Sequence, residues 1–367
     1  MLSFVWGPSG LTVFAAPPTV ADQVAALLIG TFVSTKFIAL FAFLFGLGFA
    51  LQTKRLRRAT GDAWATRRAY QRRLWALLAI GFAHGVLLYF GDILTAYALC
   101  GFVLLLYAGA RPATLARAAA WWFGAYALLG VLLMLGYELL LPPPSADEAA
   151  LLPEELSERF DVYAGGGYAE HLPVRAFDYL DLVWQTMLLA APFIVGLFVL
   201  GALAGRLGWL TQPERHPRVW ARARQIGWAA LPLAAVGAWL SLRAQVETPG
   251  WPSAVGFTLT SLSFPLAALY LAWIVARRDT PLVASAIRWL APAGRMPLTN
   301  YLLQSVAMGA LLSGWGLGWG ADLGAAQLSL LALAIVAVQL VASRWWIARV
   351  GQGPVEALWR RVTYGRR

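Results

Sequence analysis

The amino-acid sequence predicts an all-α fold, a polytopic transmembrane helix bundle. Two compositional features carry this prediction: 60% of the 367 residues are hydrophobic, and only 13% are charged. A soluble domain is roughly half apolar and about a quarter charged, so a soluble chain of this length could not cover so much apolar surface. The third feature is that the charges lie between long apolar stretches. We therefore expect residues 1–367 to form a single integral membrane domain.

The apolar stretches define the expected helices. A transmembrane helix needs about 20 mostly apolar residues, and about nine segments approach this length. Residues 1–18 are interrupted by prolines and lack a basic start, so we expect a loop there rather than a signal peptide. The expected spans are Thr31–Leu51, Leu74–Phe90, Ile93–Ala110, Leu115–Leu141, Leu182–Gly205, Gln225–Ser241, Ala254–Ala276, Leu298–Gly314 and Gly324–Trp346.

The charged residues between the spans predict the orientation. Residues 52–73, 206–224 and 277–295 are rich in arginine, whereas 142–181 holds half of the chain's 18 acidic residues. Basic loops stay in the cytoplasm, so we expect 142–181 to be an acidic extracytoplasmic loop and the C-terminus to be cytoplasmic. Residues 354–364 have apolar side chains on one helical face and arginines opposite, which predicts a cytoplasmic interfacial helix on the inner leaflet.

Charge and cysteine content exclude several classes. The net charge of +11 comes from loops between apolar spans, which indicates membrane orientation and membrane lipids as partners, with no nucleic acid. Cys100 is the only cysteine, which excludes an intramolecular disulfide, a cysteine-based zinc site and an iron–sulfur cluster. We expect no metal site and no permanently bound cofactor.

His84 is the central candidate for function, and Asp92 accompanies it. A titratable side chain inside an apolar span is costly unless it is paired or faces water, so such residues mark functional sites. A neutral imidazole could act as a general base toward an acceptor hydroxyl or amine; the alternative is a core histidine bonded to a neighbour. Asp92 could orient His84 only if the chain turns back, and otherwise it caps the following helix.

Four further polar residues are candidates for substrate binding. Lys36 could bind a phosphate or a lipid headgroup, or it could extend to the outer interface. Arg295 and Asn300 stand at an expected helix start, where anions are favoured, so they could hold the phosphates of acyl-CoA or of a lipid. The alternative for Arg295 is an orientation signal, and for Asn300 a helix cap. Gln304 enters the same span from the cytoplasmic side.

Four motifs resemble those of the YeiB-like family of bacterial membrane proteins. They are KFIALFAFLFGLGF at 36–49, RRL…GFAH…GDIL..YA at 72–98, GRMPLTNYLLQS at 294–305 and GPVEALWR..TYG at 353–365. They cover nearly the whole chain in the family's order. We expect Gly46 and Gly48 in the first motif to serve helix packing rather than to form a cofactor loop.

The resemblance carries further expectations. The family begins with a helix bearing an LDxLRGxAL-type motif, and residues 2–10 resemble the loop after it, so the resemblance implies a missing first helix and ten spans in the full family. The family is distantly similar to transmembrane acyltransferases of the heparan-glucosaminide N-acetyltransferase type. This implies transfer from cytoplasmic acyl-CoA to an extracytoplasmic or membrane acceptor, with His84 as base, in the bacterial inner membrane. A transporter or lipid-handling protein is the alternative, and a sensor or scaffold is the third class.

Overall fold

The computed structural model describes residues 19–140, 158–246 and 265–364. These residues form helices and no strand, which confirms the predicted all-α fold. Short 3-10 or π segments and a helix over 158–165 connect the main elements. The main helices are α1 (Val20–Phe32), α2 (Lys36–Thr60), α3 (Ala63–Leu87), α4 (Leu94–Leu104), α5 (Pro112–Leu140), α7 (Tyr168–Gln185), α8 (Ala191–Leu207), α9 (Pro217–Val246), α11 (Pro265–Arg277), α12 (Pro281–Gly294), α13 (Pro297–Leu312), α14 (Ala325–Val350) and α15 (Pro354–Tyr364).

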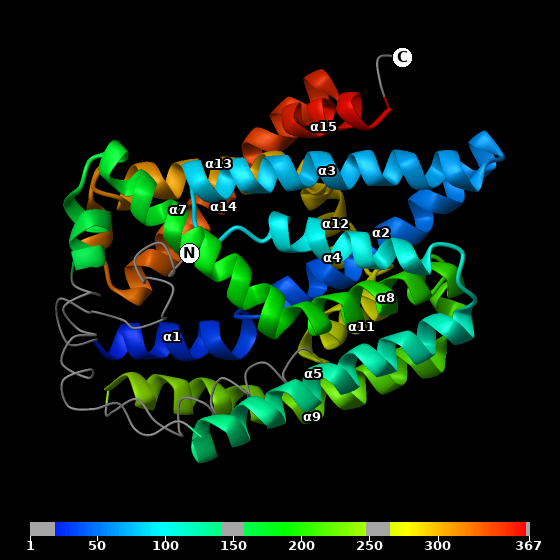
Figure 1. Cartoon of the computed structure of the whole chain (residues 1–367), viewed down its shortest axis with the longest axis horizontal. Helices are drawn as coiled ribbons and strands as arrows, with labels where there is room; N and C mark the ends of the chain where they lie inside the picture. The colour runs from blue at the N-terminus through cyan, green and yellow to red at the C-terminus, as the bar shows by residue number, and fades with distance from the viewer. Residues whose placement is uncertain (1–18, 141–157, 247–264, 365–367) are drawn as a thin grey trace.

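Helices α2 and α8 pack at the centre of the bundle, between α4 and α11 (Figure 1). A Cβ on Gly46 of α2 would overlap the carbonyl oxygen of Phe198, and a Cβ on Gly201 of α8 would overlap that of Phe43. Small residues let helix backbones approach this closely inside a membrane. The expected packing role is therefore confirmed for Gly46. It is wrong for Gly48, because a Cβ there would meet only the Gln52 side-chain amide, at 3.9 Å.

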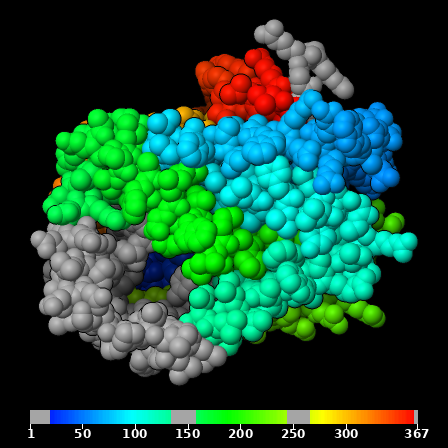
Figure 2. Space-filling model, viewed as in Figure 1, coloured from blue at the N-terminus to red at the C-terminus, as the bar shows by residue number. Residues whose placement is uncertain are grey.

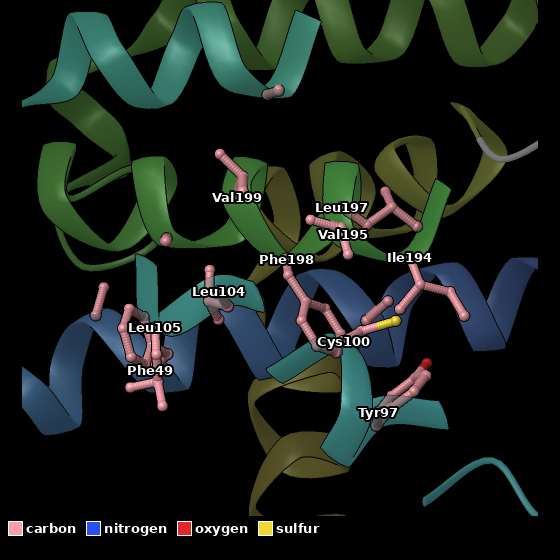
Figure 3. Packing of buried hydrophobic residues seen from close by; sticks show 14 of the residues in the cluster. Phe49, Tyr97, Cys100, Leu104, Leu105, Ile194, Val195, Leu197, Phe198 and Val199 are labelled. Atoms are coloured by element: carbon pink, nitrogen blue, oxygen red, sulfur yellow. The ribbon is translucent and has the colours of Figure 1, made fainter. Parts of the chain in front are cut away.

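An aromatic cluster joins α2, α8 and α4. The Phe198 ring stacks on Phe45 with centroids 4.5 Å apart, and it meets the edge of the Tyr97 ring at 5.3 Å. Figure 3 shows Phe198 reaching from α8 toward Tyr97 and Cys100 of α4. The Tyr97 hydroxyl also donates to the carbonyl of Ile38 at 2.7 Å. Aromatic pairs add about 0.5–1.5 kcal/mol each beyond their buried area, so this cluster fixes α4 against α2.

Several helices are long and apolar enough to cross a membrane. In α14, side chains such as Leu330, Leu333 and Val338 are more than half exposed, which suits lipid rather than water. The membrane class is therefore confirmed, while the number of spans and their orientation stay predictions. Within the described residues the spanning candidates are Val20–Thr60, Pro112–Leu133, Tyr168–Leu207, Pro217–Arg243 and Ala325–Val350, with Leu94–Tyr107 and Pro265–Arg277 as shorter apolar helices.

The first expected span, Thr31–Leu51, is wrong as one continuous helix. Helix α1 ends at Phe32 and α2 begins at Lys36, and Thr35 between them has a left-handed backbone with φ of 65°. Two carbonyls near the end of α1 accept side-chain donors: Gly30 accepts from Lys36 Nζ at 2.7 Å, and Phe32 accepts from the Tyr270 hydroxyl at 2.8 Å. The first bond is local and the second is tertiary, and both stabilise a break that apolar periodicity alone does not reveal.

The loop expected at 142–181 also needs correction. Residues 158–165 are helical and α7 begins at Tyr168, while 141–157 lie outside the described residues. At least one acidic residue that was expected in the loop stabilises a helix end instead: Glu170 accepts a hydrogen bond from Gly167 N at 2.7 Å at the start of α7. Helix α12 was also missed, because its sequence was interpreted as a basic loop. Helix α15 has the predicted bounds.

Candidate functional site: a Ser-His-Asp triad between three helices

The turn between α3 and α4 brings His84 and Asp92 together. Helix α3 ends one turn after His84, with the N–H groups of Leu88 and Tyr89 both donating to the His84 carbonyl at 2.9 Å. The chain then reverses, so that α4 packs back against α3 (Figure 1). Gly81 permits the close approach, since a Cβ there would lie 2.8 Å from Asp92 Oδ2 and 2.6 Å from Thr95 N.

Asp92 performs both roles that the sequence left as alternatives. Its Oδ1 lies 2.9 Å from His84 Nδ1. Its Oδ2 accepts the backbone N–H of Thr95 at 2.8 Å, in the first turn of α4. One carboxylate therefore caps a helix and orients the imidazole, and the cap holds its second oxygen toward His84.

Ser305 of α13 completes the site from a distant part of the chain. Its Oγ lies 2.8 Å from His84 Nε2. A second contact of this hydroxyl, with the Tyr301 carbonyl one turn earlier, is longer at 3.4 Å. With Asp92 as a carboxylate acceptor, Nδ1 donates to it and the neutral ring keeps Nε2 as the acceptor for the serine hydroxyl. Asp92, His84 and Ser305, here called the triad, thus have the connectivity of a nucleophile, a base and an orienting carboxylate.

The triad is buried and lies within a wider polar network. His84, Asp92 and Ser305 expose only 2%, 5% and 5% of their surface. The Tyr301 ring packs against the imidazole with centroids 4.8 Å apart, and its hydroxyl lies 3.4 Å from Asp92 Oδ1. On the α7 side, the Tyr179 hydroxyl and Thr95 Oγ1 are 2.7 Å apart. Helices α3, α4, α7 and α13 therefore meet at one polar centre.

The four residues expected to bind substrate lie outside the triad, and three of them bond to other parts of the chain. Lys36 is fully buried and bonded to its own chain at Gly30, so it neither reaches an interface nor faces an anion site. Arg295 is exposed and donates to the Gly351 carbonyl at 2.7 Å, which ties the connection between α12 and α13 to the connection between α14 and α15. Asn300 exchanges bonds with the Ser343 hydroxyl of α14 at 3.1 and 3.2 Å. Gln304 is half-buried, and none of the described residues bonds its side chain.

The closing motif anchors α15 to the helices that carry the triad. Glu356 Oε1 accepts the backbone N–H groups of Leu298 and Thr299 at 2.7 and 3.0 Å, which caps the N-terminus of α13. Trp359 Nε1 donates to the Arg73 carbonyl at 3.0 Å, and the Arg73 guanidinium lies 3.8 Å from the centre of the indole ring. Helix α15 therefore fixes α13 relative to α3, which sets where Ser305 meets His84.

Sequence reasoning missed Ser305 and a second polar cluster around α7. Ser305 ends the motif at 294–305, but a serine in an apolar helix commonly bonds its own backbone, so nothing in the local pattern distinguishes Ser305 from other serines. In the second cluster, Asp178 accepts from Arg159 at 2.8 Å and from the Tyr163 hydroxyl at 2.9 Å. Burial and the Asp178 charge raise the pKa of the Tyr163 phenol. In the described part of the chain, no group of three His, Cys, Asp or Glu side chains could hold a metal ion.

Comparison with known proteins identifies the class. The sequence profile described as "Protein of unknown function (DUF418)" matches residues 204–366. The "Uncharacterized protein YxaH" of Bacillus subtilis (strain 168) is 31% identical over 364 residues, covering 94% of this chain and 83% of the relative. The "Uncharacterized protein YeiB" of Escherichia coli (strain K12) is 31% identical over 349 residues, covering 89% and 81%. No solved structure gives a significant match.

The protein is thus a helical integral membrane protein with a buried polar centre. The identity and coverage of these relatives show that it belongs to the YeiB-like family, as the four motifs indicated. The names of the relatives state no activity, so acyl transfer remains a proposal.

Proposed function

We propose that this protein transfers acyl groups within the membrane, with Ser305 as nucleophile, His84 as general base and Asp92 as the group that orients His84. The observation that carries the proposal is the pair of contacts of one buried imidazole, 2.9 Å from the Asp92 carboxylate and 2.8 Å from the Ser305 hydroxyl. A nucleophile bonded to a base, and the base bonded to a third orienting group, is the arrangement that activates a serine hydroxyl.

In the first step the donor is an acyl thioester, with acyl-CoA as the expected form. His84 Nε2 takes the hydroxyl proton as Ser305 Oγ bonds to the carbonyl carbon, and Asp92 stabilises the imidazolium that forms. The carbon–sulfur bond then breaks, and the leaving thiolate takes the proton from His84. The products are an ester on Ser305 and a free thiol, so protons and electrons balance.

In the second step the acyl group passes to an acceptor hydroxyl or amine. His84 takes the acceptor proton while the acceptor bonds to the ester carbonyl, and the bond to Ser305 Oγ breaks as the serine regains its proton. His84 is thus neutral before and after each step. General acid–base assistance of this kind contributes about 10²–10⁴-fold to a rate.

The proposal includes an orientation in the bacterial inner membrane, with the donor in the cytoplasm and the acceptor outside or in the membrane. The alternating basic and acidic connections support this orientation. The proposal also places His84 within the membrane. His84 follows Arg73, the last of a basic run, by 11 positions, or about 16 Å along α3. With Arg73 at the cytoplasmic surface and α3 along the membrane normal, this distance puts His84 near the middle of a hydrocarbon core about 30 Å thick.

A transporter is the second candidate, and one observation favours it. The polar contacts continue past the triad through the Asp92–Thr95 bond to the Tyr179 hydroxyl of α7. Buried His and Asp side chains in such chains also form proton relays in transporters. The transporter hypothesis predicts that no covalent acyl group forms on Ser305.

The decisive experiment looks for the acyl-enzyme. Purified protein is incubated with acetyl-CoA or palmitoyl-CoA without an acceptor, and intact mass and peptide mapping are recorded. We expect an acyl adduct at Ser305 that is lost in Ser305→Ala and in His84→Ala. Ser313→Ala is the matched control, because Ser313 is a buried serine that follows the same helix outside the triad. Melting temperatures of all variants test whether each remains folded.

Two outcomes would contradict the proposal. One is an adduct that persists in Ser305→Ala at an unchanged amount. The other is acyl transfer to an added acceptor by a folded His84→Ala protein at the wild-type rate.

A further inference from the structure

A basic cavity lies far from the triad, where several helix ends meet. The ends of α2 and α8, the starts of α3 and α5, and the connection after α4 enclose a volume of about 720 Å³. Thr66, which lines it, precedes His84 by 18 residues in α3, a separation of about 27 Å along the helix. The space-filling view shows α3, α4 and α5 following one another across this face of the molecule (Figure 2). The cavity is therefore a separate site, and its volume lies in the range of small-molecule sites, roughly 300–1,000 Å³.

The charges around the cavity are all positive. Lys54, Arg57, Arg67 and Arg206 line it, and its lining includes no Asp or Glu. Across the described residues, none of these four side chains forms an ion pair. The neighbouring acid Asp62 is already used, since its two oxygens accept the backbone N–H groups at the start of α3. The cationic groups are therefore available to an anion from outside the chain.

The remaining lining is apolar or already bonded. Leu105, Leu106 and Trp64 supply apolar surface. The Thr53 and Thr66 hydroxyls donate to backbone carbonyls of their own helices at 2.7 and 2.8 Å, so they offer no free O–H to a ligand. The cavity can therefore recognise a ligand through its negative charge and its apolar surface. Guanidinium groups bind phosphate through paired N–H donors, and three arginines around one cavity favour an anion with more than one negative charge.

We propose that this basic cavity binds the phosphate group of an amphiphilic molecule, with the apolar part of that molecule against Trp64 and the leucines. The phosphate belongs either to the headgroup of an anionic lipid or to a phosphorylated soluble molecule. The cavity lies at helix ends whose connections are the arginine-rich ones expected in the cytoplasm, where both sources occur. The proposal does not depend on acyl transfer and stands if the triad proves to be structural.

The test is a titration of the full-length protein in an uncharged detergent at low salt, followed by calorimetry. One arm uses dioctanoyl phosphatidic acid, whose phosphomonoester can carry two negative charges, and the other uses inorganic diphosphate. We expect saturable binding in at least one arm, and we expect the double variant Arg57→Gln/Arg206→Gln to weaken it roughly 10- to 100-fold. The matched control is Arg55→Gln/Arg58→Gln, which removes the same charge from exposed positions of α2 outside the cavity.

Each outcome decides the proposal. Binding of the lipid alone identifies a headgroup site. Binding of diphosphate alone supports phosphate recognition by a soluble ligand and overturns the proposed apolar contact with Trp64 and the leucines. Wild-type protein that binds neither probe overturns the proposal. It is also overturned if the control variant loses as much affinity as the cavity variant, because the attraction then comes from overall charge. All substituted side chains are exposed, and melting temperatures check that each variant is folded.

Discussion

The bond between His84 and Asp92 makes a quantitative prediction. The perturbation is a double-mutant cycle of His84→Ala, Asp92→Ala and the double variant. The loss of unfolding free energy in the Asp92→Ala variant alone overstates the free energy of the His84–Asp92 bond, because this substitution also removes the acceptor for Thr95 N. The cycle cancels that loss because the Thr95 bond does not involve His84.

The structure sets the magnitude of the coupling free energy. The side chains are 2.9 Å apart and expose 1% and 0% of their surface. Hydrogen bonds between neutral groups in membrane bundles average about 0.6 kcal/mol, with a maximum near 1.7 kcal/mol. Bonds to an ionised group contribute about 1.5–3 kcal/mol. The proposed mechanism requires a carboxylate, so we expect a coupling of about 1.5–3 kcal/mol, and only about 0.6 kcal/mol for the neutral His84–Ser305 pair.

The assay is reversible unfolding in mixed micelles with an increasing fraction of dodecyl sulfate, followed by tryptophan fluorescence. The control cycle pairs His84 with Asn300, which lies on the same helix as Ser305 but bonds to Ser343. We expect that control to be additive within about 0.3–0.5 kcal/mol. A His84–Asp92 coupling no larger than the control would refute the oriented pair, and with it the role assigned to Asp92.

Three further predictions concern the fold and its orientation. Gly46→Ala should destabilise the protein by about 1–3 kcal/mol through overpacking, and Gly48→Ala should not, since a Cβ there meets only an amide at 3.9 Å; melting temperatures compare the two. Glu356→Gln should lower the unfolding free energy by about 1–3 kcal/mol, because a charged acceptor for two N–H groups is lost, and faster proteolysis of α15 should accompany it; unchanged stability and proteolysis would contradict the cap. In a background without Cys100, a cysteine at Glu158 should react with an impermeant maleimide in intact cells, and one at Arg215 only after permeabilisation; the opposite pattern would reverse the orientation.

Composition and local pattern determined the class of this protein. The apolar fraction and the spacing of charges predicted a helical membrane protein. Every helix that contacts lipid needs apolar side chains over the width of the hydrocarbon core, so its charged residues lie in the connections. Helix α15 was predicted with its bounds, since its two faces differ in its own sequence. His84 was selected as a titratable group inside an apolar span, where an unpaired imidazole is costly, and Asp92 was selected as its possible partner at the following turn.

Only the tertiary structure decided how those residues are used. Ser305 is separated from His84 by 221 positions, and α13 brings it to 2.8 Å, while Glu356 and Trp359 anchor α15 to both α13 and α3. Lys36 was expected to face an anion or an interface, but its partner is a carbonyl of its own chain. The local sequence shows that a buried polar side chain needs a hydrogen-bond partner. Which residue becomes that partner depends on how helices distant in the sequence pack together.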